Sequence, residues 1–174
     1  MTKSEQKIIK LLADYPEKEF YGQEIADKLK ISKASVSGIL KLLSQKGVVF
    51  REIKGHMKFY QINRRNPEFK KFRINLALEK VEPFLPKLKK FSQKVILFGS
   101  ASRGEQTFDS DIDIFVLSYE KNSVRAIFKE IDAKLKIKAV IKTPSEWSEM
   151  EIKEPEFYQE VKNGITLYEY FPGI

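Results

Sequence analysis

Two aspartates, Asp111 and Asp113, open an apolar segment that reads SDIDIFVL. Such an alternation is typical of a β-strand, in which residues i and i+2 project from the same face. We therefore expect the two carboxylates side by side, with Ile112, Ile114 and Val116 on the opposite, buried face. Neighbouring carboxylates repel one another, and a hard cation such as Mg²⁺, or Mn²⁺ in its place, relieves this repulsion together with substrate phosphates. The pair predicts a divalent metal site.

A turn of small residues precedes the pair. Residues 95–98 form a short run of strand type, and Gly99-Ser100 and then Arg103 follow it. A strand that feeds such a turn exposes backbone N–H groups, and a helix starting near Ala101 would add its dipole. We expect phosphate oxygens to bind here, with a hydroxyl from Ser100 and a positive charge from Arg103. An ordinary structural turn is the alternative here. For the aspartates, the alternative is a pair on a solvated strand end, which does not explain why the pair lies twelve residues after a phosphate-type glycine.

The combination of G-S-x-x-R-G with S-D-I-D-I resembles the signature of the polymerase-β-like nucleotidyltransferase superfamily, especially its minimal stand-alone members, over about residues 92–170. The resemblance implies that Gly99, Ser100 and Arg103 bind a nucleoside triphosphate and that Asp111 and Asp113 are the catalytic, metal-coordinating carboxylates. It implies attack of an acceptor hydroxyl or phosphate on the α-phosphorus, with pyrophosphate leaving and two metal ions about 4 Å apart.

One strand departs from the family pattern. Active members usually carry a third carboxylate on the next core strand, which here is residues 136–141 and reads KIKAVI. We expect Lys138 to point toward the site, where it would compete with a metal ion or contact phosphate. Asp109 is a candidate substitute for the missing acid. A domain that binds only nucleotide, or only a partner protein, is therefore the alternative to an enzyme.

Further elements complete this second domain. We expect a helix over residues 122–135 and, over residues 157–167, a helix, a glycine and a closing strand, which together make a small α/β domain with a mixed sheet. Trp147 and Tyr158 are candidates for a nucleotide-base pocket, with a place in the core as the alternative.

The first part of the chain has helical periodicity followed by extended chain. We expect a helix from a Ser4 cap to Tyr15, a second over residues 22–30, and a third over residues 33–46 capped by Ser32. Its predicted buried residues include Ile39. Residues 48–62 alternate as in a β-hairpin, with a turn at Lys54-Gly55.

This order resembles the winged helix-turn-helix domain of prokaryotic transcription regulators over residues 4–63. The resemblance implies that the third helix enters the major groove of double-stranded DNA and that the hairpin is the wing. The implied DNA contacts are Ser32, Lys33, Ser35, Ser37 and Lys41 on the helix, and Lys54 and Lys58 on the wing, with His56 as a solvated wing residue. A winged helix used for protein contact or for dimerisation is the alternative.

The predicted organisation is therefore α+β in three parts. A winged helix of three helices plus a β-hairpin spans residues 1–65, a helical connector spans residues 66–91, and a minimal nucleotidyltransferase domain spans residues 92–174. The connector begins at Pro67, a good first-turn residue, and carries apolar residues that pack one domain on the other or pair two chains as a homodimer.

Composition agrees with a polyanionic partner. The 174 residues are 42% apolar, enough for folded domains, and carry a net charge of +8. Residues 1–65 contain 14 Lys or Arg and 7 Asp or Glu, and residues 66–94 contain 8 and 3. Residues 95–174 contain 10 basic and 14 acidic residues. This asymmetry favours nucleic acid at the basic end and cations at the acidic end, with simple solvation of charged helix faces as the alternative.

Several classes are excluded. No cysteine is present, which removes disulfide scaffolds, thiolate metal sites and cysteine nucleophiles, and the single His56 cannot build a His-rich zinc site. No apolar run approaches the ~20 residues of a membrane span, and residues 1–12 lack the core of a signal peptide. We expect a cytoplasmic protein without a membrane partner.

Two functions remain open. One is a DNA-binding protein that transfers a nucleotidyl group from a nucleoside triphosphate, with magnesium, to an unidentified protein, small-molecule or nucleic-acid acceptor. The alternative is a transcriptional regulator, or an antitoxin-like protein beside a toxin partner, whose nucleotidyltransferase domain binds nucleotide or a partner protein without catalysis.

Overall fold

The computed structural model describes residues 1–107, 110–131 and 133–170, with Lys134 described by its backbone alone. Contacts within the chain divide it into two units, Met1–Lys71 and Phe72–Ile174. The division falls inside one helix, α4 (Pro67–Val81), so each unit is described separately. The predicted boundaries at residues 65 and 91 stay predictions. No helix in the described part of the chain is both long enough and apolar enough to span a membrane.

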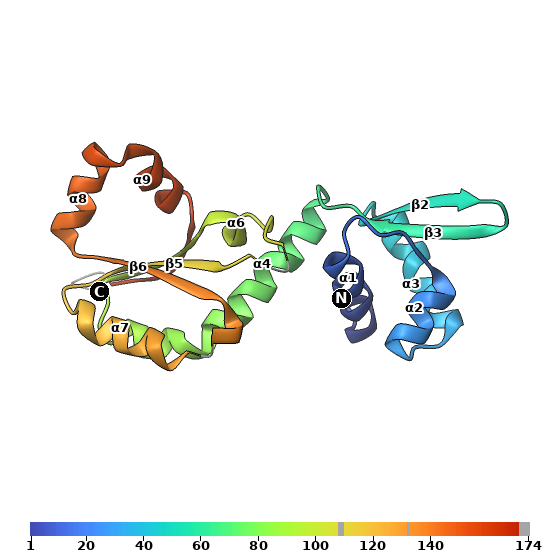
Figure 1. Ribbon diagram of the computed structural model, residues 1–174, viewed down its shortest axis with the longest axis horizontal. Coiled ribbons are helices and arrows are strands. Elements are labelled where there is room, and N and C mark those ends of the chain that lie inside the picture. The colour runs from blue at the N-terminus through green and yellow to red at the C-terminus, as the bar shows by residue number, and fades with distance from the viewer. Residues whose placement is uncertain (108–109, 132, 171–174) are drawn as a thin grey trace. The chain divides into compact units, whose positions relative to one another are not determined.

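The first unit has the element order of a winged helix (Figure 1). Its elements are α1 (Lys3–Asp14), β1 (Phe20–Tyr21), α2 (Gly22–Leu29), α3 (Lys33–Gln45), β2 (Val49–Lys54) and β3 (Met57–Ile62). The strands form an antiparallel sheet in the order β1-β3-β2. The predicted helices and hairpin are confirmed, whereas β1 was not predicted because two residues carry no periodicity.

Capping residues set where two of these helices begin. Ser32 caps α3 as predicted, its hydroxyl accepting a hydrogen bond from the Ser35 N–H at 3.2 Å. The predicted Ser4 cap of α1 is wrong. Thr2 caps this helix because its hydroxyl accepts from the Glu5 N–H at 3.2 Å while the Glu5 carboxylate accepts from the Thr2 N–H at 2.6 Å, a reciprocal capping box.

The hairpin turn lies one residue later than predicted. Lys54 pairs with Met57 in the β2–β3 ladder, so the turn consists of Gly55 and His56. Gly55 has a φ of 61°, a left-handed conformation that glycine adopts without strain.

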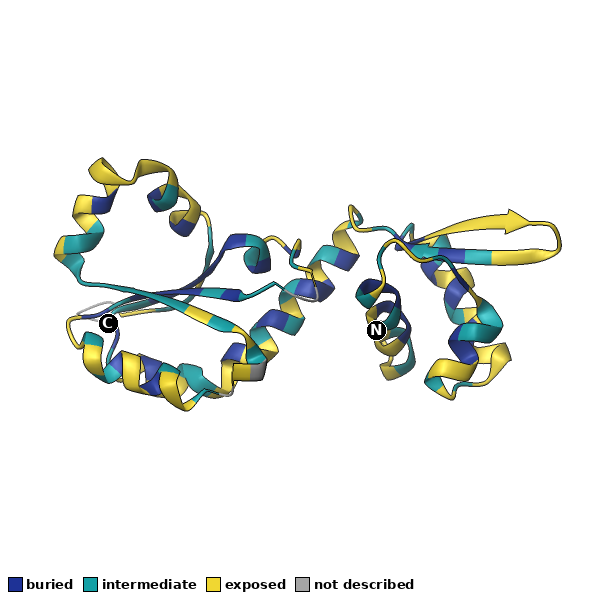
Figure 2. Ribbon diagram, in the orientation of Figure 1, coloured by how far each residue is buried: buried dark blue, intermediate teal, exposed yellow. Residues whose placement is uncertain are grey.

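The core of the first unit is built from one face of each helix and one face of the sheet (Figure 2). Its buried side chains include Ile8, Ile9, Leu12, Phe20, Ile25, Val36, Leu40, Leu43, Tyr60 and Ile62. Ile39, predicted to be buried, is half-buried. Beyond its first residue, β2 is exposed along its length.

The second unit is a sheet with helices on both faces. After α4 come the 3-10 turn η1 (Glu82–Phe84), α5 (Leu85–Lys89), β4 (Lys94–Phe98), α6 (Gly99–Ser102), β5 (Ile112–Leu117), α7 (Lys121–Glu130), the 3-10 turn η2 (Ala133–Leu135), β6 (Ile137–Lys142), α8 (Pro144–Lys153), α9 (Pro155–Lys162) and β7 (Ile165–Glu169). The helix predicted over residues 122–135 is too long, because α7 ends at Glu130.

The described strands of this unit form a mixed sheet, as predicted, and their order is β6-β5-β4-β7. β5 runs parallel to β6, and β4 runs antiparallel to β5 and β7. In this register Asp113 lies opposite Phe98 of β4 and opposite Lys138 of β6. One end of the sheet therefore brings the aspartate pair next to the start of the predicted phosphate turn and next to a lysine.

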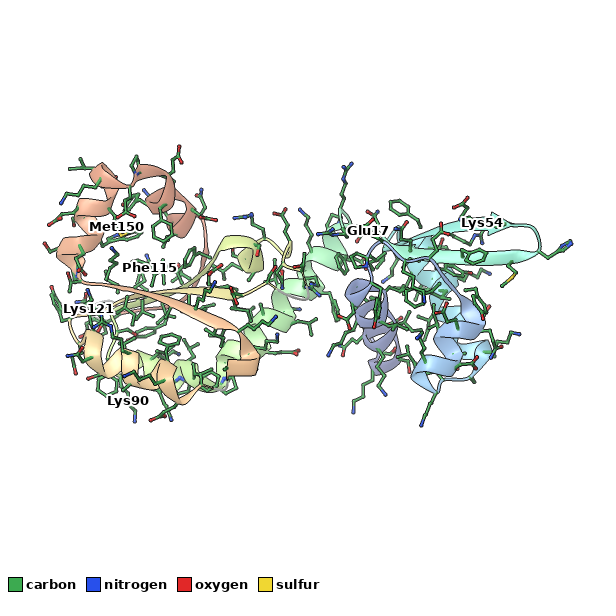
Figure 3. All side chains as sticks on the ribbon, in the orientation of Figure 1. Glu17, Lys54, Lys90, Phe115, Lys121 and Met150 are labelled. Carbon is green, nitrogen blue, oxygen red and sulfur yellow. The ribbon has the colours of Figure 1, made fainter. Side chains whose placement is uncertain are left out.

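Alternate residues of β5 face different cores. Ile112, Ile114 and Val116 are buried, as predicted, and they pack with residues of α4, α5 and α7. Phe115 points to the other face and packs with Met150 of α8 under the α8–α9 pair (Figure 3). Because residues i and i+2 share a face, Asp113 lies on the α8–α9 side of the sheet.

Candidate active site

The predicted phosphate turn is the short helix α6. It begins at Gly99, two residues before the predicted start, and spans four residues. A helix of one turn has little dipole, so the expected contribution of a helix dipole to phosphate binding is corrected. The first N–H groups of a helix have no acceptor within it, and these remain the phosphate donors that the turn can offer. The Glu105 N–H donates to the Ser100 carbonyl at 2.9 Å and closes the turn.

Gly99 joins this turn to the aspartate pair. Its φ is 68°, and it is buried. A Cβ atom added at this position would lie 2.8 Å from Oδ2 of Asp113, closer than real Cβ contacts come. The turn and the second aspartate are therefore in direct contact, and the position requires glycine for its conformation and for its lack of a side chain.

The two aspartates share the end of β5 with a lysine from the neighbouring strand. Asp111 directly precedes β5 and Asp113 is its second residue. Nζ of Lys138 lies 2.5 Å from Oδ2 of Asp111, and the Lys138 side chain is 69% exposed against 33% for Asp111. Lys138 points toward the pair, as the resemblance to the family implied.

The pKa values at this end of the sheet reflect burial and charge. Burial raises the pKa of Asp113; the negative charges of Asp111 and Glu160 act in the same direction, and the Lys138 ammonium opposes them. The hydrogen bond and charge of Asp111 raise the pKa of Lys138. A cation beside Asp113 would therefore stabilise its ionised form.

The donor set fits a divalent cation held jointly with a substrate. Carboxylates and phosphate oxygens are the ligands that Mg²⁺ prefers, and it is commonly bound by one or two carboxylates plus phosphates. Within residues 1–107, 110–131 and 133–170, no group of three or more His, Cys, Asp or Glu side chains could hold a metal ion. Asp111 and Asp113 are the carboxylates that would hold such an ion together with the triphosphate. Asp109, the proposed substitute acid, lies outside the described residues.

Arg103 is held by two carboxylates. Its Nε lies 3.1 Å from Oε2 of Glu105, and its Nη1 lies 3.5 Å from Oε1 of Glu160 on α9. These hydrogen bonds raise the pKa of Arg103, Glu105 having the larger effect. A triphosphate at Arg103 would have to replace these partners. No sequence signal identifies Glu160, because the fold alone brings α9 to the turn.

A second contact missed by the sequence holds the segment between the turn and the aspartates. Arg73 of α4 is buried, and its Nη2 donates to the Gln106 carbonyl at 2.7 Å. The Gln106 side-chain amide donates in return to the Arg73 carbonyl at 2.9 Å. This reciprocal pair ties Gln106, three residues after Arg103, to α4.

Trp147 and Tyr158 lie in the core. The Trp147 ring is 4.7 Å from the Phe115 ring and 4.4 Å from the Tyr158 ring, centroid to centroid. Both belong to the apolar cluster under α8 and α9, in agreement with the alternative of a place in the core.

The predicted DNA-contacting side chains of the first unit are exposed. They are Ser32, Lys33, Ser35, Ser37, Lys41, Lys54 and Lys58. Ser32 and Ser35 also take part in the N-terminal cap of α3, where the Ser32 hydroxyl donates a hydrogen bond to the Ser35 hydroxyl at 2.8 Å. Lys54 pairs with Glu19 at 2.5 Å and with Glu52 at 3.5 Å. Lys54 would have to exchange these carboxylates for phosphate.

Several solved structures resemble the chain. A double mutant of ZitR from Lactococcus lactis matches at 22% identity and a TM-score of 0.39, over 53% of this chain and 63% of that one, so less than two thirds of ZitR is spanned. The transcriptional regulator BldR from Sulfolobus solfataricus matches at 16% identity and a TM-score of 0.34, over 48% and 70%. A protein of Sulfolobus solfataricus provisionally assigned as a nucleotidyltransferase matches at 20% identity and a TM-score of 0.38, over 62% and 89%.

No curated protein matches the sequence. The family model for the nucleotidyltransferase domain matches residues 78–167, just over half of the chain, and this stretch includes the Gly99 turn, the aspartate pair and the whole of β6. The chain therefore belongs to the nucleotidyltransferase domain family.

Proposed function

We propose that this protein transfers a nucleotidyl group from a nucleoside triphosphate to an acceptor, with a divalent metal held by Asp111 and Asp113. The observation that supports the proposal is the contact between the Gly99 turn and Asp113, because the N–H groups of the turn and the two carboxylates meet at one end of the sheet. The family match over the same residues supports it.

The reaction exchanges one phosphorus–oxygen bond for another. The acceptor oxygen forms a bond to the α-phosphorus, the bond to the oxygen bridging to the β-phosphate breaks, pyrophosphate leaves with that electron pair, and the acceptor proton passes to water. Bound Mg²⁺ supplies Lewis acidity and neutralises phosphate charge. Ser100 and the turn's N–H groups bind and orient the triphosphate, and Arg103 binds it after leaving its carboxylate partners.

Transfer of label tests the proposal. Each nucleoside triphosphate, labelled at the α-phosphate, is incubated with the protein and a cell lysate in Mg²⁺ or Mn²⁺. We expect the label on one acceptor and a loss of about 100-fold or more in Asp111→Asn, because a metal ligand is removed. Glu151→Gln, an exposed position on α8, serves as the matched control. Equal labelling by Asp111→Asn and wild type would contradict the proposal.

A second candidate is a regulator whose nucleotidyltransferase domain binds nucleotide without transferring it. The ion pair between Lys138 and Asp111 favours it, because an ammonium already neutralises one of the two metal-binding carboxylates. Calorimetry with the same nucleotides separates the two functions. Binding without labelling of any acceptor would establish this alternative, in which the partner is a protein such as a toxin or a second copy of the chain.

We also propose that the winged-helix unit binds double-stranded DNA. Small polar residues and two lysines, Lys33 and Lys41, are exposed on α3, and residues 1–65 carry seven more basic than acidic residues. In fluorescence anisotropy with duplex DNA, Lys33→Ala/Lys41→Ala should weaken binding, and the slope of log K against log salt should fall by roughly 0.9 for each phosphate that the variant no longer neutralises. Lys10→Ala on α1 is the control. An unchanged slope in the double variant would contradict this interface.

A further inference from the structure

A lysine that is not part of the family pattern, Lys138, lies beside the aspartate pair. Lys138 lies opposite Asp113 in the parallel pairing of β5 with β6, and its ammonium is 2.5 Å from Oδ2 of Asp111. It also interacts electrostatically with Asp113. One cationic group therefore already faces both carboxylates.

A carboxylate oxygen that bonds an ammonium at this distance has less capacity to bridge two metal ions. A divalent ion added on the same oxygen would meet the ammonium charge at close range, where like charges repel strongly. In the described part of the chain no group of three or more His, Cys, Asp or Glu side chains could hold a metal ion, and on β6 the residue opposite Asp113 is Lys138 and not an acid. Both observations favour a single divalent ion.

An ammonium can perform part of what a second metal ion does. Lys138 carries three N–H donors, and Asp111 accepts one of them. The other two can donate to an α-phosphate oxygen and to the acceptor oxygen, where negative charge develops during transfer. The side chain is 69% exposed, which leaves its end accessible to a substrate.

We propose that this site works with one divalent ion and that the Lys138 ammonium takes the place of the second. The inference rests on the proposed function, and it makes Lys138 a catalytic residue that contacts the reacting atoms. Lys138 donates hydrogen bonds to the α-phosphate and to the attacking oxygen and keeps its own proton throughout.

Metal stoichiometry tests this independently of turnover. Mn²⁺ bound per chain is measured by electron paramagnetic resonance, with a nucleoside triphosphate analogue whose α,β-bridge is a methylene group. We expect one Mn²⁺ in the wild type and in Lys138→Met, and two in Lys138→Asp, which restores a carboxylate at this position. Transfer should fall about 100-fold in Lys138→Met. Lys142→Met, on the same strand, is the control and should match the wild type in both measurements.

The outcomes separate this inference from the function on which it rests. Two Mn²⁺ in the wild type, or wild-type transfer by Lys138→Met, would overturn the role of Lys138 while leaving nucleotidyl transfer intact. One Mn²⁺ in Lys138→Asp would overturn it as well. Absence of nucleotide and Mn²⁺ binding in a folded wild type would overturn both proposals. One Mn²⁺ in the wild type and two in Lys138→Asp would support the inference, whatever the acceptor is.

Discussion

Gly99 and Asp113 approach each other so closely that a Cβ on Gly99 would lie 2.8 Å from Oδ2 of the carboxylate. The two residues come from adjacent antiparallel strands, Gly99 following β4 and Asp113 within β5. The carboxylate therefore fills the space that a side chain would take. A side chain added at Gly99 must displace the Asp113 carboxylate. Truncation of Asp113 would in turn remove the group that packs against Gly99.

Gly99→Ala should impair both stability and nucleotide binding. A left-handed φ of 68° is unfavourable for alanine, and the new methyl group displaces Asp113, so we expect a loss of about 1–3 kcal/mol in unfolding free energy. Transfer should fall at least about 10-fold. Thermal unfolding and calorimetry measure these effects. Gly38→Ala on α3, where a Cβ meets nothing within 4 Å, should instead stabilise its helix slightly. Wild-type stability and binding in Gly99→Ala would contradict the argument.

Gly164→Ala should destabilise the second unit through a backbone clash. A Cβ there would lie 2.5 Å from the Leu97 carbonyl oxygen and 2.6 Å from Cγ2 of Ile96. Because a carbonyl in the central sheet cannot move freely, we expect a cost of about 1–3 kcal/mol. Chemical denaturation measures it. A variant as stable as the wild type would show that β7 and β4 can separate without cost.

Phe115→Ala should loosen the cluster beneath α8 and α9. Phe115 is 1% exposed and its ring lies 4.7 Å from that of Trp147, so truncation leaves a cavity and a cost of about 3–5 kcal/mol. Trp147 is the single tryptophan of the chain, and its fluorescence reports directly on this cluster. Ile152→Ala on α8, at 84% exposure, is the control and should change stability by about 0.5 kcal/mol or less. An unchanged fluorescence spectrum in Phe115→Ala would contradict the packing.

Features that depend on neighbouring residues could be predicted from the sequence. The period of two in the SDIDI segment was enough to separate Asp113 from the buried Ile112 and Ile114. Ser32 could be predicted as a cap because a capping side chain bonds a backbone N–H three residues on. The element order of the first unit followed from where the helical periodicity ends.

Features that depend on distant residues could not be predicted. Glu160 reaches Arg103 across 57 positions, and Gln106 reaches Arg73 across 33. The start of α1 was predicted wrongly because Thr2 and Ser4 can both cap a helix. Glu5 favours Thr2, since its carboxylate completes a capping box with that residue. The start of α8 does have a local signal in the sequence, the Thr143-to-Glu146 spacing of a capping box.

The cap of α8 predicts how acid affects the second unit. Glu146 accepts hydrogen bonds from Lys121 Nζ at 2.8 Å and from the Thr143 N–H at 2.7 Å, and these lower the pKa of Glu146 from 4.5 to about 2, Lys121 having the larger effect. Since the folded-state pKa is the lower one, these bonds stabilise the fold above pH 4.5 and lose their effect as the pH falls toward 2.

Glu146→Gln should therefore flatten the dependence of Tm on pH between about 4.5 and 2, while lowering Tm at neutral pH. The side chain is 42% exposed, so added salt should shrink the difference between variant and wild type. Calorimetric scans at a series of pH values, at low and high salt, measure both effects. Glu151→Gln removes a carboxylate from the same helix without touching Lys121 or Thr143, and should change the profile less. If Glu146→Gln and Glu151→Gln give the same acid profile, the α8 cap contributes nothing to stability in this range, and the low pKa of Glu146 is refuted.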